Sequence, residues 1–289
     1  MRLITCEIDG GKPQVAVIGE DNLVYGFPCE NISMTEFIKR YGDRVREEAE
    51  EAISSGQGIP LEEVRLLAPI PYPEQDILCL GMNYHDHVAE AEKFDAAFQA
   101  DKAKAVYFSK RVNCCPGHNG EFSCHSNLTS MADYEVELAV IIGKDAFHVS
   151  YEDAEDYIFG YTIINDVTAR EVQTGHNQWY FGKSLDGFSP MGPWIVTKEE
   201  ISYPPKLEIK SFVNGELRQN STTDCLIHSI SEIISELSSG MTLKAGTVIA
   251  TGTPEGVGMG MNPPVFLKPG DEVVCFIEGI GELKNIVVE

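Results

Sequence analysis

Two glutamates, two residues apart, open an apolar run near the middle of the chain. The segment DYEVELAVIIG covers residues 133–143. In a β-strand, alternation would put Glu135 and Glu137 on one face and Val136 and Leu138 on the other, whereas on a helix the glutamates would be about 200° apart. Two carboxylates side by side are unfavourable unless a cation neutralises them or one takes up a proton. The pattern alone is also typical of a solvated strand face, so a site requires another partner.

A third carboxylate follows a later strand-like run. Asp166 ends the apolar part of YTIINDVTAREVQ, and TAREVQ is typical of the start of a helix. Taken alone, Asp166 fits a helix cap or a partner of Arg170, four residues later. Joined with Glu135 and Glu137, it would complete a set of oxygen ligands that selects Mg²⁺ or Mn²⁺, and Ca²⁺ less readily.

A candidate general base lies in NYHDHVAEAE. On a helix, His87 and Glu90 would share one face, where the carboxylate can orient the imidazole and increase its basicity. His85 lies two residues away, so spacing leaves the choice of base open. A solvated polar turn is the plainer interpretation.

Two segments carry groups that could hold an anion. We expect Lys183 in a Gly-, Ser- and Pro-bearing loop, WYFGKSLDGFSPMGPW, between apolar runs. It or Arg170 could bind a substrate carboxylate, although a surface lysine is the usual alternative. IATGTPEGVGMG places Gly252 and Thr253 at the end of a strand, where amides and a hydroxyl can hold an anionic group. This segment lacks the residue order of a phosphate loop, which argues against nucleotide binding.

The segment CCPGHNGEFSCH gathers three cysteines and two histidines. Paired zinc ligands are usually separated by about two to four residues, whereas Cys114 and Cys115 are adjacent. We interpret the segment as a turn-rich loop that leads into the DYEVEL strand, and not as a zinc site.

The elements that must position these groups are mostly β. From residue 76 onward, apolar runs such as ILCLG, MGPWIVT and EVVCFIEG recur between Gly and Pro turns, which favours a sandwich, barrel or roll. An apolar stripe predicts a helix over residues 34–54, and SISEIISELSSG predicts another helix with Gly240 as a left-handed cap. Three prolines between positions 69 and 73 mark a boundary between a small α/β N-terminal domain (1–70) and a main domain (71–289).

The composition limits the partners. The chain has 289 residues and a formal net charge of −23, which would repel nucleic acid and an anionic membrane surface. The amino terminus reaches charged residues too early for a signal peptide, and no apolar run approaches the length of a membrane span. We therefore expect a cytoplasmic protein whose eight cysteines are reduced and whose ligand is a small molecule.

The ordered motifs LGMNYHDHVAEAE, YFSK, DYEVELAVIIG, NDVTAREVQ, FGKSLDGFSPMGPWIV, VNGELRQ and TGTPEGVG resemble the fumarylacetoacetate hydrolase family from about residue 76 to the carboxyl terminus. The resemblance implies a mixed, mainly β fold with a β-roll catalytic domain, and a homodimer. It implies a divalent metal bound by Glu135, Glu137 and Asp166. Matched residue by residue, it also implies catalytic or substrate-contacting roles for His87, Glu90, Lys183, Arg170, Gln173 and Thr253.

One position departs from the founding hydrolases of that family. They place an earlier Asp near the metal, whereas this chain has Asn83 and Tyr84 in that region. This is the pattern of the shorter bacterial and mitochondrial members. The departure argues against fumarylacetoacetate itself as the substrate.

The chemistry read from the residues agrees with the resemblance. A 2-oxo acid can chelate a metal, and the cation then stabilises the enolate left when the bond beyond C3 breaks. We expect a hydrolase that cleaves a C–C bond in a 2,4-dioxo acid of the acylpyruvate or fumarylpyruvate type, with His87 and Glu90 activating water. An oxaloacetate decarboxylase or tautomerase, or a 2-hydroxymuconate isomerase or hydratase, could use the same parts. The alternative of another class is a non-catalytic metal- and ligand-binding protein.

Overall fold

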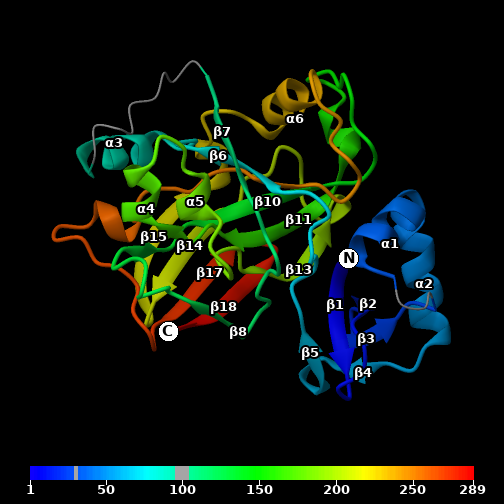
Figure 1. Cartoon of the computed structure of the whole chain (residues 1–289). Coiled ribbons are helices and arrows are strands. Elements are labelled where there is room, and N and C mark those ends of the chain that lie inside the picture. Colours follow the sequence, from blue (N-terminus) through cyan, green and yellow to red (C-terminus); the bar gives the residue numbers. More distant parts are fainter. Residues whose placement is uncertain (29–31, 95–103) are drawn as a thin grey trace.

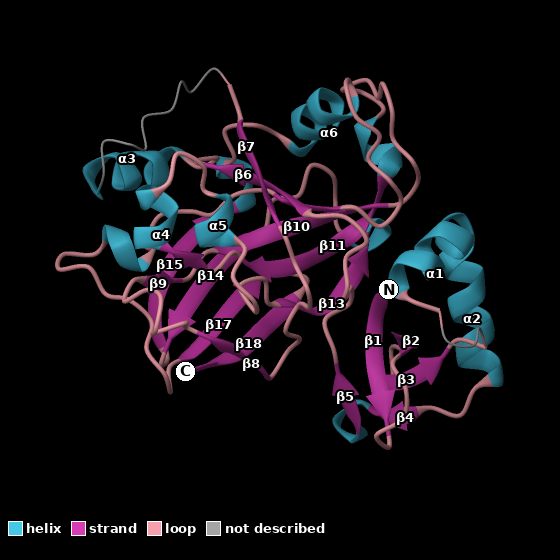
Figure 2. Ribbon diagram, in the orientation of Figure 1, coloured by secondary structure: helices cyan, strands magenta, loops and turns pink. Residues whose placement is uncertain are grey.

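Two β-sheets form the framework of the fold, in a computed structural model that describes residues 1–28, 32–94 and 104–289 (Figure 1). The larger sheet has eleven strands in the order β4-β3-β2-β1-β13-β11-β10-β16-β6-β7, with β5 paired to β1. The second sheet has five strands in the order β15-β14-β17-β18-β8, and β9 and β12 form a short pair. The prediction of a mixed, mainly β fold is confirmed (Figure 2).

The strands of the larger sheet are β1 (Arg2–Ile8), β2 (Gln14–Ile18), β3 (Leu23–Gly26), β4 (Ile59–Pro60), β5 (Val64–Leu66), β6 (Ile77–Gly81), β7 (Val106–Lys110), β10 (Val136–Ile142), β11 (Ile158–Asn165), β13 (Met191–Thr197) and β16 (Val248–Ala250). The others are β8 (Gly120–Ser123), β9 (Ala132–Asp133), β12 (Thr168–Ala169), β14 (Glu208–Val213), β15 (Glu216–Thr222), β17 (Glu272–Ile277) and β18 (Gly281–Val288). The α-helices are α1 (Met34–Tyr41), α2 (Val45–Ser55), α3 (His85–Phe94), α4 (Arg170–Gly175), α5 (Tyr180–Lys183) and α6 (Ile230–Ser238).

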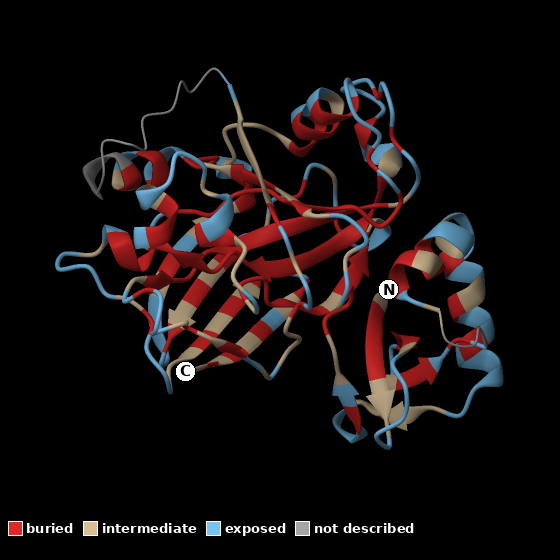
Figure 3. Ribbon diagram, viewed as in Figure 1, coloured by how far each residue is buried: buried red, intermediate tan, exposed pale blue. Residues whose placement is uncertain are grey.

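Every residue of strand β10 is buried (Figure 3), and its apolar side chains alternate between two cores. Val136 and Leu138 belong to the core shared with the five-stranded sheet. Ala139 and Ile141 belong to the core shared with α1 and the amino-terminal strands. Glu137 has the same parity as Ala139, so the predicted alternation is confirmed, and the carboxylate points away from the core between the sheets.

The first strands continue the larger sheet. β1 pairs with β13 through Arg2 opposite Val196 and Leu3 opposite Ile195. α1 contributes Phe37 to the same core as β10. The division into domains at residues 70 and 71 stays a prediction.

Two predictions about helices are wrong in detail. The helix expected over residues 34–54 is divided into α1 and α2 by a 3₁₀ turn at Gly42–Arg44, which begins at a glycine, a residue of low helix propensity. α6 ends at Ser238, and Gly240 is not among the glycines with positive φ, so it does not form the left-handed cap that was expected.

Within the described ranges, no helix combines the length and apolar character that a membrane span requires.

Asn83 anchors the turn that leads from β6 into α3. Its Nδ2 donates to the carbonyl oxygens of Thr251 (2.8 Å) and His228 (3.1 Å), and its Oδ1 accepts from the amide of His228 (2.7 Å). Gly252 has a φ of +102°, and a Cβ there would lie 2.7 Å from the Cβ of Asn83. The asparagine that replaces the earlier Asp of the founding hydrolases therefore has a structural role.

We predict that Asn83→Asp destabilises the protein by about 2 kcal/mol at neutral pH, because a carboxylate oxygen would face two carbonyl oxygens without a donor. Urea unfolding in EDTA measures the change without a cation that could compensate the new charge. Asn177→Asp, at an exposed position, is the control and should change stability little. An Asn83→Asp protein as stable as the wild type would contradict the anchoring role.

Candidate active site

Three carboxylates meet where two antiparallel strands begin and end. Glu135 directly precedes β10, Glu137 lies within it, and Asp166 directly follows β11. Val136 pairs with Asn165, which brings the start of one strand beside the end of the other. All three side chains are buried, and one ligand atom from each lies within 4.8 Å of the others. Their predicted convergence is confirmed.

Two lysines form ion pairs with Asp166, one at each of its carboxylate oxygens. Nζ of Lys183 lies 2.7 Å from Oε2 of Glu135 and 2.7 Å from Oδ2 of Asp166. Lys110, which is fully buried, donates from Nζ to Oδ1 of Asp166 and to the carbonyl oxygen of Val167 (3.0 Å). Lys183 is therefore no surface lysine, and it ends the short helix α5 instead of lying in the loop expected from the sequence.

The three carboxylates differ in their electrostatic surroundings. Burial alone would raise the pKa of Glu135, but Lys183 and Arg170 outweigh it and lower this pKa to about 2. Burial, together with repulsion from Asp166 and Glu135, raises the pKa of Glu137 well above its usual value. Burial would lower the pKa of Lys183, but Asp166 and Glu135 reverse this effect and raise it. Glu137 is thus the carboxylate most in need of another cation.

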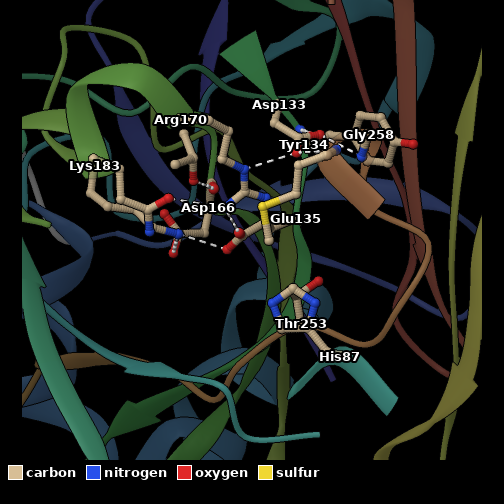
Figure 4. Close-up of polar contacts among 12 residues, drawn as sticks. His87, Asp133, Tyr134, Glu135, Asp166, Arg170, Lys183, Thr253 and Gly258 are labelled. Atoms are coloured by element: carbon tan, nitrogen blue, oxygen red, sulfur yellow. Dashed lines mark hydrogen bonds and ion pairs between the residues drawn. The ribbon is translucent and has the colours of Figure 1, made fainter. Parts of the chain in front are cut away.

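Arg170 begins α4 and points at the same group (Figure 4). Its Nε lies 2.9 Å from Oδ2 of Asp133, and its Nη1 lies 2.6 Å from Oε1 of Glu135 and 3.2 Å from Oε1 of Gln173. Its Nη2 is buried and has no hydrogen-bond partner. A buried donor without a partner is costly, so Nη2 is suited to a ligand's carboxylate.

The segment after β16 supports Glu137. The amide of Gly252 donates to Oε2 of Glu137 (2.8 Å). The anionic group expected at this amide is therefore the Glu137 carboxylate of the protein itself in the free structure. The hydroxyl of Thr253 donates to the carbonyl oxygen of Val136 (2.9 Å) and accepts from Nε2 of Gln219 (2.7 Å).

His87 and Glu90 contact one another on α3, as the spacing predicts. Nδ1 of His87 lies 3.2 Å from Oε2 of Glu90, and the amide of Gly256 donates to Oε1 of Glu90 (3.1 Å). His87 is buried, whereas His85 is exposed. Figure 4 shows His87 and Thr253 on the opposite side of Glu135 from Lys183. The structure therefore favours His87 as the base.

A small enclosed cavity lies among these residues. Its volume is about 20 Å³, and its walls include His87, Glu135, Glu137, Arg170, Lys183 and Thr253. A space of this size holds about one water molecule or ion. A 2-oxo acid needs more room, so the surrounding side chains would have to shift for one to bind.

The residues fit a divalent cation. All three candidate ligand groups are carboxylates, which suit Mg²⁺ and Mn²⁺. Among the described residues, four buried carboxylates, including Asp133, face three buried cationic side chains, Lys110, Lys183 and Arg170. If all four were ionised, one negative charge would stay uncompensated, in line with the raised pKa of Glu137.

Three buried residues of this region were not singled out from the sequence: Lys110, Asp133 and Gln219. For Lys110 the signal was a lysine at the end of the apolar run AVYF, and for Asp133 it was strand parity with Glu135.

The alternative of Asp166 as a helix cap is wrong, because Ala169 occupies the N-cap position of α4.

The Cys- and His-rich segment lies apart from the carboxylates. It contains β8, with Cys115 and Cys124 buried and Cys114 exposed. Within the described ranges, the residue group that could hold a metal is Glu135, Glu137 and Asp166. The seven cysteines of the described part are free thiols.

Comparison with known proteins identifies relatives across the chain. Residues 76–288 match the family model for the C-terminal part of fumarylacetoacetate (FAA) hydrolase. The oxaloacetate tautomerase YisK of Bacillus subtilis is 48% identical over 226 residues, which cover 78% of this chain and 73% of that protein.

Two solved structures share the whole architecture. A fumarylacetoacetate hydrolase from the psychrophile Exiguobacterium antarcticum is 39% identical, with a TM-score of 0.86, and the match covers 100% of this chain and 99% of that one. Maleylpyruvate hydrolase from Sphingobium sp. SYK-6, solved with manganese(II) and pyruvate, is 30% identical, with a TM-score of 0.80 and the same coverage. These homologues are named as enzymes, and one of them was solved with manganese. The chain is likewise an enzyme, and it belongs to the fumarylacetoacetate hydrolase family.

Proposed function

We propose that this enzyme is a divalent-metal-dependent oxaloacetate tautomerase, which interconverts the enol and keto forms of a 2-oxo acid. The observation that carries the proposal is the buried group of Glu135, Glu137 and Asp166. The two glutamates of this group line one cavity together with His87 and Arg170. The 48% identity to an oxaloacetate tautomerase supports this choice among the activities of the family.

The metal would be Mg²⁺ or Mn²⁺, held by Glu135, Glu137 and Asp166. A divalent cation there supplies the positive charge that stabilises the enol and enolate forms of a 2-oxo acid. Lys183 bridges two of these carboxylates in the free protein, and a cation bound there would compete with it for their oxygens, so we expect it to release at least one of them. Its ammonium group can then face the substrate.

The remaining side chains bind the substrate and move its proton. Nη2 of Arg170 offers a buried donor to the carboxylate, and Gln173 fixes the guanidinium from one side. Glu90 holds Nδ1 of His87, which leaves Nε2 to exchange a proton with C3 of the substrate. The proton added at C3 balances the one lost from the enol oxygen.

Hydrolysis of an acylpyruvate or fumarylpyruvate, the activity expected from the sequence, is the second candidate. The same His87 and Glu90 pair favours it, because a buried imidazole oriented by a carboxylate can also activate water. The two reactions use the same protein groups and differ in the substrate. We also propose that the enzyme is a cytoplasmic homodimer, as the family resemblance implies.

We predict that Glu137→Gln weakens Mn²⁺ binding at least about tenfold, because it removes a charged ligand. The melting temperature of the metal-free protein should not fall, since glutamine keeps the shape and can still accept from Gly252 while removing a buried charge. Calorimetric titration with Mn²⁺ and thermal unfolding in EDTA measure the two effects. Unchanged Mn²⁺ affinity would contradict the ligand assignment.

We predict that the wild-type enzyme with Mg²⁺ or Mn²⁺ accelerates the loss of enol absorbance from oxaloacetate and that EDTA abolishes the effect. Glu90→Ala should lower kcat by about 100-fold, the scale of general acid–base catalysis, with Mn²⁺ affinity unchanged. Asp86→Ala, at an exposed position of the same helix, is the matched control and should keep full activity.

The second candidate is assayed beside the first by pyruvate release from acylpyruvates. Release of pyruvate without any acceleration of enol loss would replace the tautomerase proposal with the hydrolase. Turnover that persists without metal would contradict both.

A further inference from the structure

Asp133 joins three separate segments of the chain. Its carboxylate is fully buried. Oδ1 accepts from the amides of Tyr134 (2.9 Å) and Gly258 (2.7 Å), and Oδ2 accepts from the amide of Met259 (3.0 Å) and from Nε of Arg170 (2.9 Å). Four donors account for all the lone pairs of the carboxylate. Asp133 thus fixes the start of α4 against the 3₁₀ turn at residues 258–260.

The segment held by Asp133 also supports Glu90. The amide of Gly256 donates to Oε1 of Glu90 (3.1 Å). Gly260 lies so close that a Cβ there would collide with the carboxylate of Glu90. The other oxygen of Glu90 contacts His87. A shift of the backbone over residues 256–260 would therefore displace the orienting partner of His87.

Asp133 also sets the direction of Arg170. The guanidinium is planar and rigid. Nε contacts Asp133 and Nη1 contacts Glu135, and these two contacts fix where the unpartnered Nη2 points. Without the contact to Asp133, the guanidinium could rotate about its contact between Nη1 and Glu135. Nη2 would then no longer point in one fixed direction.

We propose that Asp133 is a positioning residue that couples the orientation of the Arg170 guanidinium to the position of the His87 and Glu90 pair. It is not among the candidate metal ligands, and it lies too deep to be exposed to solvent. One carboxylate holds both the guanidinium that faces the substrate and the segment that supports Glu90 (Figure 4). The kinetic consequence rests on the proposed function, whereas the coupling concerns contacts of the free protein.

The kinetic test uses Asp133→Asn, which keeps the shape but turns one acceptor into a donor that faces other donors. With oxaloacetate and saturating Mn²⁺, KM should rise and kcat should fall, each by about tenfold, while Mn²⁺ affinity stays within about threefold. A residue needed only for folding would lower the active fraction and leave KM unchanged. In a Glu90→Ala background, Asp133→Asn should reduce kcat far less than in the wild type, because both act through His87.

A second measurement does not depend on the folding of the Asp133 variant. In Arg170→Lys, which loses the contact from Nε, hydrogen exchange of the amides of Gly258 and Met259 should be at least about fivefold faster than in the wild type. Arg65→Lys changes an exposed ion pair with Glu7 and serves as the matched control. It should leave both amides unaffected.

Three outcomes would each overturn the proposal: an unchanged KM in Asp133→Asn, multiplicative losses of kcat in the double variant, or unchanged exchange at both amides in Arg170→Lys. The two proposals can fail separately. A wild-type enzyme that leaves oxaloacetate unchanged, but whose amides respond to Arg170→Lys, would refute the tautomerase and keep the coupling. If the wild-type enzyme is an active tautomerase but Arg170→Lys leaves the exchange of both amides unchanged, the coupling is refuted and the tautomerase is kept.

Discussion

The burial of three carboxylates within 4.8 Å of one another is the constraint on which the rest of the site depends. Such a group is strongly unfavourable in a protein interior unless cations compensate it. The chain supplies Lys110 from β7, Arg170 from α4 and Lys183 from α5. Each of these contacts ties an element to the ends of β10 and β11, so the electrostatic requirement also fixes the walls of the cavity. If these carboxylates and Asp133 were all ionised, one negative charge would stay uncompensated, which a divalent metal would neutralise.

The sequence predicted the parts of the site that follow from local periodicity. Strand alternation put Glu135 and Glu137 on one face, and helical spacing put His87 beside Glu90; both are confirmed. Asp166 could not be joined to the glutamates by spacing, because its place depends on the pairing of β10 with β11, and the ordered family motifs supplied that link. Lys110 and Asp133 were missed because their partners are distant in sequence. Gly42 shows a limit of another kind, because the apolar stripe continues past a glycine at which the regular helix is interrupted.

The shared scaffold explains why relatives of one fold carry different enzyme names. A tautomerase and a hydrolase of 2-oxo acids both require stabilisation of an enolate and a positioned base. The proposed metal ligands, Arg170 and the His87 and Glu90 pair would meet those requirements without specifying which atom of the substrate receives the proton or the water. Selectivity must then come from residues that decide where the substrate lies relative to His87. Asp133 affects that geometry because it contacts both sides of the site.

The most direct test of the central claim is a crystal structure with Mn²⁺ and oxalate, with the manganese located by its anomalous scattering. We predict an anomalous peak bounded by Glu135, Glu137 and Asp166, with Nζ of Lys183 moved away from at least one of the two carboxylates that it bridges in the free protein. Manganese bound elsewhere, or no peak and an unmoved Lys183 at saturating Mn²⁺, would contradict the account.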